Sequence, residues 1–169
     1  MSLVVETGLG LSNAESYASV ADSVAYHSGI GDNTWSGITA TEQEQALRRA
    51  TVYLVGKYRM RWAGSRMTTS QALDWPRSSV PVVDTPHRSY YPNDSVPREV
   101  VAACCAMARR AAAGELLSDQ GQRASSVTVG PISKTFEAGS TVATQYPEIN
   151  ALLRPLLRSG GGQIRMVRA

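Results

Sequence analysis

The stretch TEQEQALRRATVYLVGKYRMRW, residues 41–62, predicts an amphipathic helix. It opens on a Thr-x-x-Glu pattern at Thr41 and Glu44, in which each side chain can hydrogen-bond the backbone at the start of a helix. Apolar residues then recur at the spacing of one helix face. They are Leu47, Ala50, Leu54 and Tyr58, with Ala46 and Tyr53 beside them. One side of this helix should therefore lie in the protein core.

The other side of the same helix carries two valines among arginines. At about 100° per residue, Val52 and Val55 project away from the apolar stripe and lie near Arg48 and Arg59. Single apolar residues are common on protein surfaces, and that interpretation has about equal weight. The alternative is a contact face, in which Val52, Val55, Arg48 and Arg59 meet a neighbouring subunit or partner.

Two further helices flank this one along the chain. Ser19 can cap a helix with Asp22 three residues later, which is an acidic form of the same box. Pro97 is a good first-turn residue for a helix in which residues 100–108 carry no charge. A helix that is apolar nearly all round should lie centrally, with neighbours on several sides.

The C-terminal third changes its period. Residues 126–136 alternate with period two around Gly130 and Pro131, which predicts a short hairpin or one bent edge strand. A short last helix should start at Pro147, and Pro155 should kink or end it.

These elements predict a mainly α fold. We expect a small helical bundle, residues 1–158, with the hairpin or edge strand, followed by a flexible Gly-rich tail at 159–169. Beyond three consecutive glycines, Ile164 and Met166 alternate with Arg165, a pattern that can add as a strand to another surface. A frayed terminus is an equally good interpretation.

The longest loop, residues 63–95, contains Trp75-Pro76-Arg77. A loop of this length is usually functional or held by a partner. We expect Trp75 to anchor the loop to the helical core, Pro76 to set its direction, and Arg77 to reach a neighbour's acid or its own backbone. Alternatively, Trp75 fills the core while Arg77 lies in solvent.

Catalytic and metal-binding patterns are missing from the sequence. Cys104 and Cys105 are adjacent and read as two small buried residues, and the two histidines, His27 and His87, lie in no catalytic motif. A hydrolase would need a cleft around one of these histidines. We therefore expect a protein that is not an enzyme and that has no cofactor and no metal.

Composition points to an ordinary globular protein, with 43% hydrophobic and 18% charged residues. No stretch approaches the roughly 20 apolar residues of a membrane helix, and the first residues lack the basic start of a signal peptide. We expect a soluble protein without a membrane partner, made in a reducing cytoplasm.

A basic run with interleaved aromatic residues raises the question of DNA binding. Between Glu44 and Asp74 there are only basic charges, and Arg61, Trp62 and Arg66 are the residues that could face DNA. Tyr53 and Tyr58 are on the buried side of the helix by period, which leaves a thin stacking platform. A basic surface beside a core is therefore favoured over a single-strand platform.

Six pieces of the sequence together resemble a phage family. In order they are VVETGLGLSNAESYASVADSVAYH, ALRRATVYL…YRMRWAGSRMT, SQALDWPRSSV, VPREVVAA, VGPISKTF and YPEINALLRPLL, which cover nearly the whole chain. The chain resembles the small head-tail adaptor proteins of long-tailed phages, also called connector or head-completion proteins. Proteins of this kind often carry the label of a DnaT-like single-stranded-DNA-binding protein.

The resemblance implies a structural protein of the virion neck, at the head-tail interface, which is assembled in the host cytoplasm. Copies of the chain would form a ring of twelve under the portal protein and continue the channel through which genomic DNA leaves. The other partner would be a tail-proximal neck or tail-terminator protein. DNA would pass without sequence specificity, and single-stranded-DNA binding is the alternative function.

Overall fold

A computed structural model of the chain describes residues 2–117, 126–129, 132–135 and 145–158. Within these ranges four α-helices dominate, so the mainly α fold is confirmed. They are α1 (Val20–Gly29), α2 (Ala40–Tyr58), α3 (Arg98–Ala113) and α4 (Pro147–Leu153), with single 3-10 turns η1 (Trp35–Gly37) and η2 (Arg154–Leu156). The predicted tail at 159–169 lies outside the described residues, and the division of the chain at 158 stays a prediction.

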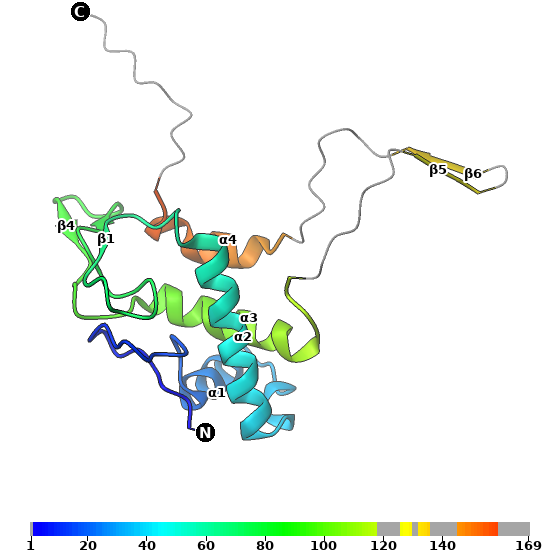
Figure 1. Cartoon of the computed structure of the whole chain (residues 1–169), viewed down its shortest axis with the longest axis horizontal. Helices are drawn as coiled ribbons and strands as arrows, with labels where there is room; N and C mark the ends of the chain where they lie inside the picture. The colour runs from blue at the N-terminus through cyan, green and yellow to red at the C-terminus, as the bar shows by residue number, and fades with distance from the viewer. Residues whose placement is uncertain (1, 118–125, 130–131, 136–144, 159–169) are drawn as a thin grey trace, which may run out of the picture.

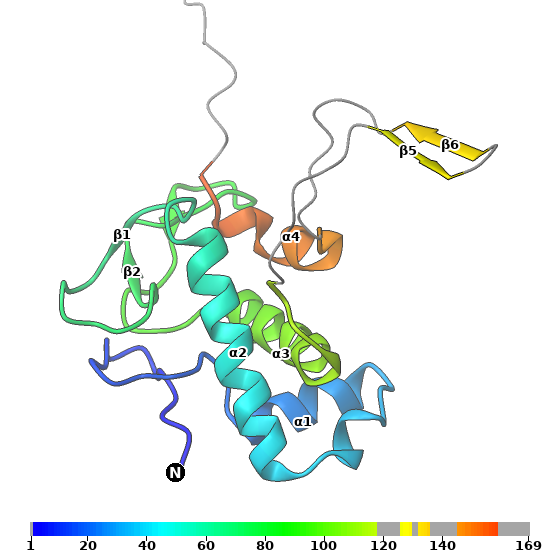
Figure 2. The same ribbon diagram turned by 45° about the vertical axis from the view of Figure 1, so that its right-hand side comes forward.

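Helix α3 is the centre of the bundle, as the absence of charge at residues 100–108 predicts. Helices α1, α2 and α4 all pack on it, and α2 makes the most extensive contact. Figures 1 and 2 show α2 crossing α3, with α1 near the start of α2 and α4 near its end. Every residue from Ala103 to Ala108 is buried. Small side chains along this stretch allow the three neighbours to approach closely.

The caps of α1 and α2 are formed by reciprocal hydrogen bonds. Ser19 and Asp22 make the predicted box at α1. At α2 the prediction is wrong by two residues, because Thr39 and Glu42 form the box in place of Thr41 and Glu44. The sequence contains both patterns in overlap. The pattern of Thr39 and Glu42 forms the cap because Gln43, in the first turn, is buried and donates from Nε2 to Trp35 O at 2.9 Å.

The loops between the helices contain pairs of short antiparallel β-strands. Strand β1 (Ser65–Arg66) pairs with β2 (Arg77–Ser78), and β3 (Pro81–Val82) pairs with β4 (Ser89–Tyr90). The segment of alternating residues forms a hairpin, β5 (Ser126–Val129) with β6 (Ile132–Thr135), in which Val129 lies opposite Ile132. Of the two predicted possibilities, the hairpin is confirmed.

The N-terminal Gly-Leu-Gly segment is organised around Glu6, which is buried. Its Oε1 accepts hydrogen bonds from the backbone N–H groups of Gly8 and Gly10, both at 2.9 Å, and its Oε2 accepts from Leu11 N at 2.8 Å. Gly8 has φ +102°, and a Cβ there would overlap the backbone oxygen of Asp94. The segment is thus a structural turn that packs on the loop before α3.

The buried polar residues near α1 have packing roles. His27 is buried, stacks on Trp35 with ring centroids 4.9 Å apart, and its Nε2 lies 3.1 Å from the Cys105 carbonyl oxygen, which accepts its hydrogen bond. Burial raises the pKa of the Cys104 thiol, and it raises the pKa of Cys105 to about 12. Both cysteines are therefore buried thiols, as expected. His87 is exposed in the loop after β3.

Two kinds of feature are absent from the described ranges. No helix there combines the length and apolar character required to cross a membrane. In the same ranges, no three His, Cys, Asp or Glu side chains come together as a group that could hold a metal ion.

Candidate nucleic-acid interface

The C-terminal end of α2 lies against the last described residues of the chain. Trp62 and Leu157 form an antiparallel bridge, and Arg158 N donates to Arg61 O at 2.8 Å. The Arg158 side chain donates from Nε to Trp62 O at 2.9 Å, across 96 positions of sequence. The packing of α4 and η2 therefore brings residues 154–158, which include two arginines, next to the basic residues that follow α2.

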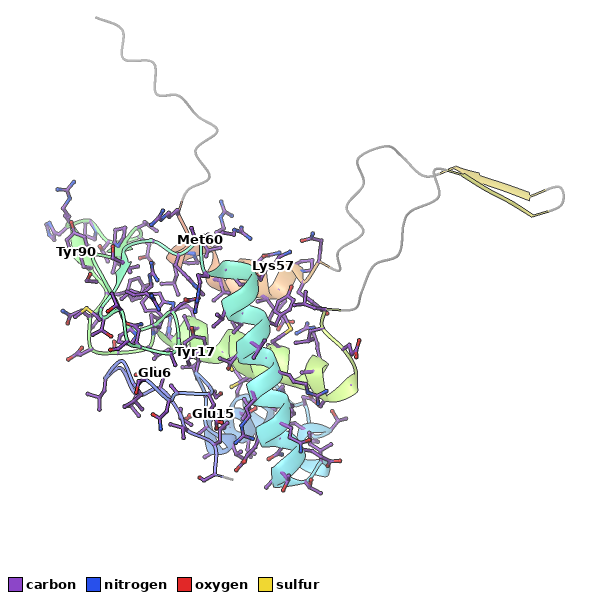
Figure 3. All side chains as sticks on the ribbon, viewed as in Figure 1. Glu6, Glu15, Tyr17, Lys57, Met60 and Tyr90 are labelled. Atoms are coloured by element: carbon purple, nitrogen blue, oxygen red, sulfur yellow. The ribbon has the colours of Figure 1, made fainter. Side chains whose placement is uncertain are left out.

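This junction gathers exposed arginines, which we call the arginine end: Arg59, Arg61, Arg66, Arg154 and Arg158. They line two hollows of about 720 and 350 Å³, and Arg158 borders both. Met60, which is 84% exposed, lies beside them at the end of α2, where Figure 3 labels it. The acids that line these hollows are Asp84 and the buried Asp74, so positive charge is in excess.

The buried carboxylate of Asp74 connects the arginine end to the protein core through hydrogen bonds. Its Oδ1 accepts from Arg59 Nε at 2.9 Å, and its Oδ2 accepts from Trp62 Nε1 at 3.1 Å. The Asp74 backbone N–H donates to the Tyr17 hydroxyl at 2.9 Å. Burial, followed by the Asp74 charge, raises the pKa of Tyr17, so this phenol stays protonated. Because a buried charge needs such partners, Asp74 fixes the position of Arg59.

The aromatic rings near the arginine end lie inside the protein. Trp75 is 0% exposed and meets Trp62 edge-on at 5.7 Å, and Trp62 contacts Tyr58 at 5.8 Å. This burial is what the predicted anchor role of Trp75 requires, and the role itself stays a prediction. The expectation that Trp62 could face DNA is wrong, because Trp62 is 1% exposed and its indole N–H is bonded to Asp74. Arg61 and Arg66, the other two candidates, are exposed.

Pro76 and Arg77 complete the fold of the Trp75 loop. The Trp75-Pro76 peptide bond is cis, which the sequence pattern did not predict, and Pro76 O accepts from Gln71 Nε2 at 3.1 Å. Arg77 is buried and donates from Nε to Ala63 O at 2.8 Å and from Nη2 to Gly64 O at 2.9 Å. Burial lowers the pKa of Arg77.

Of the two roles predicted for Arg77, bonding to its own backbone is therefore confirmed. The alternative that Arg77 lies in solvent is wrong, because carbonyl groups of its own chain accept from its buried guanidinium, which also donates to Asp74 O at 3.1 Å. Its placement in an interface with a neighbour stays a prediction.

The valine face of α2 is only partly exposed. Val52 is 68% exposed, whereas Val55 is half-buried and packs against the core, so the prediction that both project outward is correct only for Val52. An apolar groove of about 490 Å³ runs beside them and reaches Ala14 and Leu73. The exposed part of this face is thus one valine beside a groove.

Arg48, also assigned to that face, pairs with acids of its own chain. Its Nη2 lies 3.1 Å from Glu15 Oε2 and 3.4 Å from Glu44 Oε2. The hydrogen bond from Arg48 is the main cause that lowers the pKa of Glu15. Arg48 therefore braces the N-terminal segment against α2. The remaining interface candidates, Ile164, Arg165 and Met166, lie outside the described residues.

Sequence reasoning did not assign Asp74, Arg154 or Arg158 to a site. Asp74 had a usable signal, because it is the only acid between Glu44 and Asp84. A single acid in a basic run is a natural partner for one of the arginines. Arg154 and Arg158 carried no such signal, since their position depends on how α4 docks.

Comparison with known proteins identifies the family. The model of a family described as "Putative DnaT-like ssDNA binding protein" matches residues 1–169, so the chain belongs to this family over its whole length. No curated protein matches the chain, and no solved structure does.

Proposed function

We propose that the chain contacts DNA through phosphate groups at the arginine end. The observation that carries this proposal is the junction at which the α2 end and the C-terminal segment place Arg61, Arg154 and Arg158 around one hollow. Guanidinium groups pair with phosphate oxygens in a forked geometry, and such contacts supply most sequence-independent affinity for DNA. The family description supports DNA as the ligand.

The burial of the neighbouring rings limits how bases could be bound. Single-strand binders stack bases on exposed aromatic side chains. Here Tyr58, Trp62 and Trp75 are buried, and Tyr90, in β4, is the large aromatic residue with an exposed ring among the described residues, at 53%. Contact with phosphates, which positions DNA without reading or stacking its bases, therefore fits this surface better.

The biological setting that we infer is the head-tail adaptor that the sequence resembles. In this role the chain acts by assembly in the virion neck, without catalysing a reaction, and its arginine end faces the DNA that passes through the ring. Exposed apolar side chains support contacts with other proteins, notably Met60 and Val52, at 84% and 68% exposure. Partners would be further copies of the chain, the portal protein and a tail-proximal protein.

The first prediction concerns strand type. Single- and double-stranded oligonucleotides of equal charge should bind with similar affinity, within about a factor of a few, because phosphates are the contacted groups. Fluorescence anisotropy with labelled strands measures this directly. A preference for single strands above roughly tenfold would favour the second candidate function, a single-stranded-DNA-binding protein, which the family description favours.

The second prediction concerns assembly. The purified chain, mixed with the portal protein of the same phage, should yield a complex whose mass fits a closed ring of copies on the portal. The chain alone can remain monomeric, since such rings often form only on their template. Native mass measurement separates the two species. Persistent lack of association with the portal would contradict the adaptor role, and the strand comparison above would then decide on DNA binding alone.

A further inference from the structure

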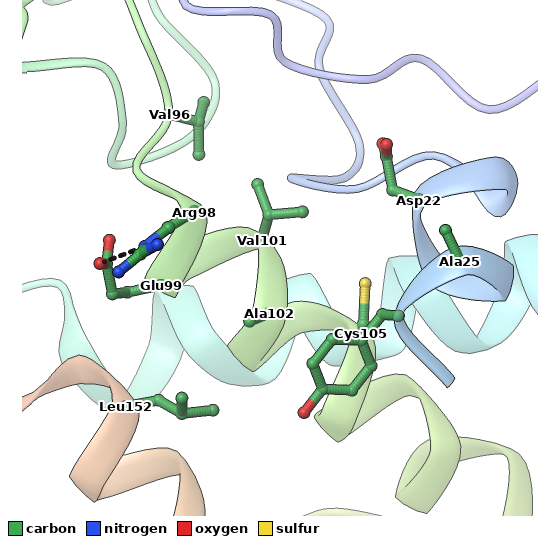
Figure 4. A pocket seen from close by; sticks show the side chains of 10 residues that line it. Asp22, Ala25, Val96, Arg98, Glu99, Val101, Ala102, Cys105 and Leu152 are labelled. Carbon is green, nitrogen blue, oxygen red and sulfur yellow. Dashed lines mark hydrogen bonds and ion pairs between the residues drawn. The ribbon is translucent and has the colours of Figure 1, made fainter. Parts of the chain in front are cut away.

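A second apolar groove, of about 690 Å³, lies between α1, α3 and α4. Figure 4 shows Ala25 on α1, Val101 on α3 and Leu152 on α4 around this space, with Val96 at one end. Half of the ten lining residues are aliphatic, and all three helices are well packed on the core. The groove is on the surface of the bundle and is separate from the residues of the arginine end.

Two acids border this groove. Asp22 lies at the start of α1 and Glu99 at the start of α3, and Figure 4 shows them on opposite sides. Glu99 Oε1 accepts from Arg98 Nε at 3.1 Å, whereas its Oε2 is buried and has no hydrogen-bond partner among the described residues. A buried carboxylate oxygen without a donor is costly, so an occupant that brings a cationic donor would be stabilised here.

We propose that the C-terminal segment of this chain, residues 163–169, docks in this groove. Its sequence, QIRMVRA, combines Ile164, Met166 and Val167 with Arg165 and Arg168. The apolar side chains match the aliphatic lining. The two guanidinium groups supply donors for the bordering carboxylates, and a charge-assisted hydrogen bond is about twice as strong as a neutral one.

Charge and length both favour this occupant. From residue 149 to residue 169 there is no acidic side chain, so no side chain of the segment repels Asp22 or Glu99. Met166 lies eight residues beyond Arg158, so in an extended chain it reaches about 26 Å from the point where Arg158 bonds to Arg61. Three of the residues between them are consecutive glycines, which can turn in any direction.

Disulfide trapping in the full-length chain tests this proposal. The pair Ala25→Cys and Met166→Cys places one thiol on the groove and one on the segment. The pair Val52→Cys and Met166→Cys is the matched control, because Val52 is exposed beside a different groove. Cys104 is 0% exposed and burial raises the pKa of its thiol. Because Cys105 lines the same groove as Ala25, both pairs are made in a Cys105→Ala background.

Under a mild oxidant, the groove pair should form its disulfide at least about tenfold faster than the control pair, because docking raises the local thiol concentration. Non-reducing gels and peptide mass mapping measure the rates. A bond within one chain or between two copies supports the proposal and tells which copy supplies the segment. Equal rates for the two pairs would overturn it.

A charge reversal tests the role of the acids. Arg165→Glu, added to the groove pair, should slow disulfide formation several-fold, and Arg165→Lys should leave it nearly unchanged. A rate unaffected by Arg165→Glu would contradict the assigned charge pairing. None of these variants alters the arginine end, so failure here is distinguishable from failure of the DNA proposal.

Discussion

Replacement of Trp75 by alanine should lower the free energy of unfolding by about 3–5 kcal/mol, the usual cost of truncating a large buried aromatic residue. Trp75 is fully buried and touches Trp62 edge-on, at 5.7 Å between ring centroids. It holds the loop that also carries Asp74 and Arg77. Loss of the ring would leave a cavity below the arginine end, so both the loop and the neighbouring helix end should loosen.

Denaturant unfolding measures the decrease in the free energy of unfolding caused by Trp75→Ala, and two further variants serve as controls. Tyr90→Ala removes an aromatic ring that is 53% exposed, and should change stability by less than about 1 kcal/mol. Trp75→Phe keeps an apolar ring and removes an indole N–H that has no partner among the described residues, so it should cost less than Trp75→Ala. If Trp75→Ala unfolds at the same denaturant concentration as the unaltered chain, Trp75 is not the anchor.

The helices could be predicted because their signals are local. Spacing of apolar residues defined α2, and the prolines at 97 and 147 marked the starts of α3 and α4. The start of α2 was missed by two residues because two Thr-x-x-Glu patterns overlap in the sequence. A contact outside the helix, from Gln43 to the Trp35 carbonyl, decides between them.

The burial of Arg77 in the Trp75 loop, and of Trp62 just after α2, could not be predicted from local sequence patterns. Arg77 is satisfied by the carbonyl groups of Ala63, Gly64 and Asp74, and backbone acceptors leave no trace in the sequence. Trp62 follows the last turn of α2, where helical periodicity no longer indicates which side faces the core. Its burial depends on the Trp75 loop, which folds over it.

Only part of the arginine end could be predicted from the sequence. The run that includes Arg59, Arg61 and Arg66 is contiguous, and its excess of positive charge could be read directly. Arg154 and Arg158 join it only because α4 and η2 return to the end of α2, and that return is a tertiary contact between segments far apart in the chain.

The second large effect concerns these arginines. Replacing Arg61 and Arg154 with alanine should weaken DNA binding roughly tenfold near physiological salt, because two phosphate contacts are lost. Both side chains are exposed, and neither is among the residues that bond Asp74, so the fold should persist. The control variant, Arg49→Ala with Arg98→Ala, removes the same charge from exposed positions outside the arginine end.

The salt dependence of DNA binding tests the central claim most directly. Each phosphate contact contributes about 0.9 to the slope of log affinity against log salt concentration. The double variant at Arg61 and Arg154 should therefore have a slope shallower by about 2, while the control keeps the slope of the unaltered chain. Equal slopes for all three proteins, or an equal reduction in the control, would contradict DNA contact at the arginine end.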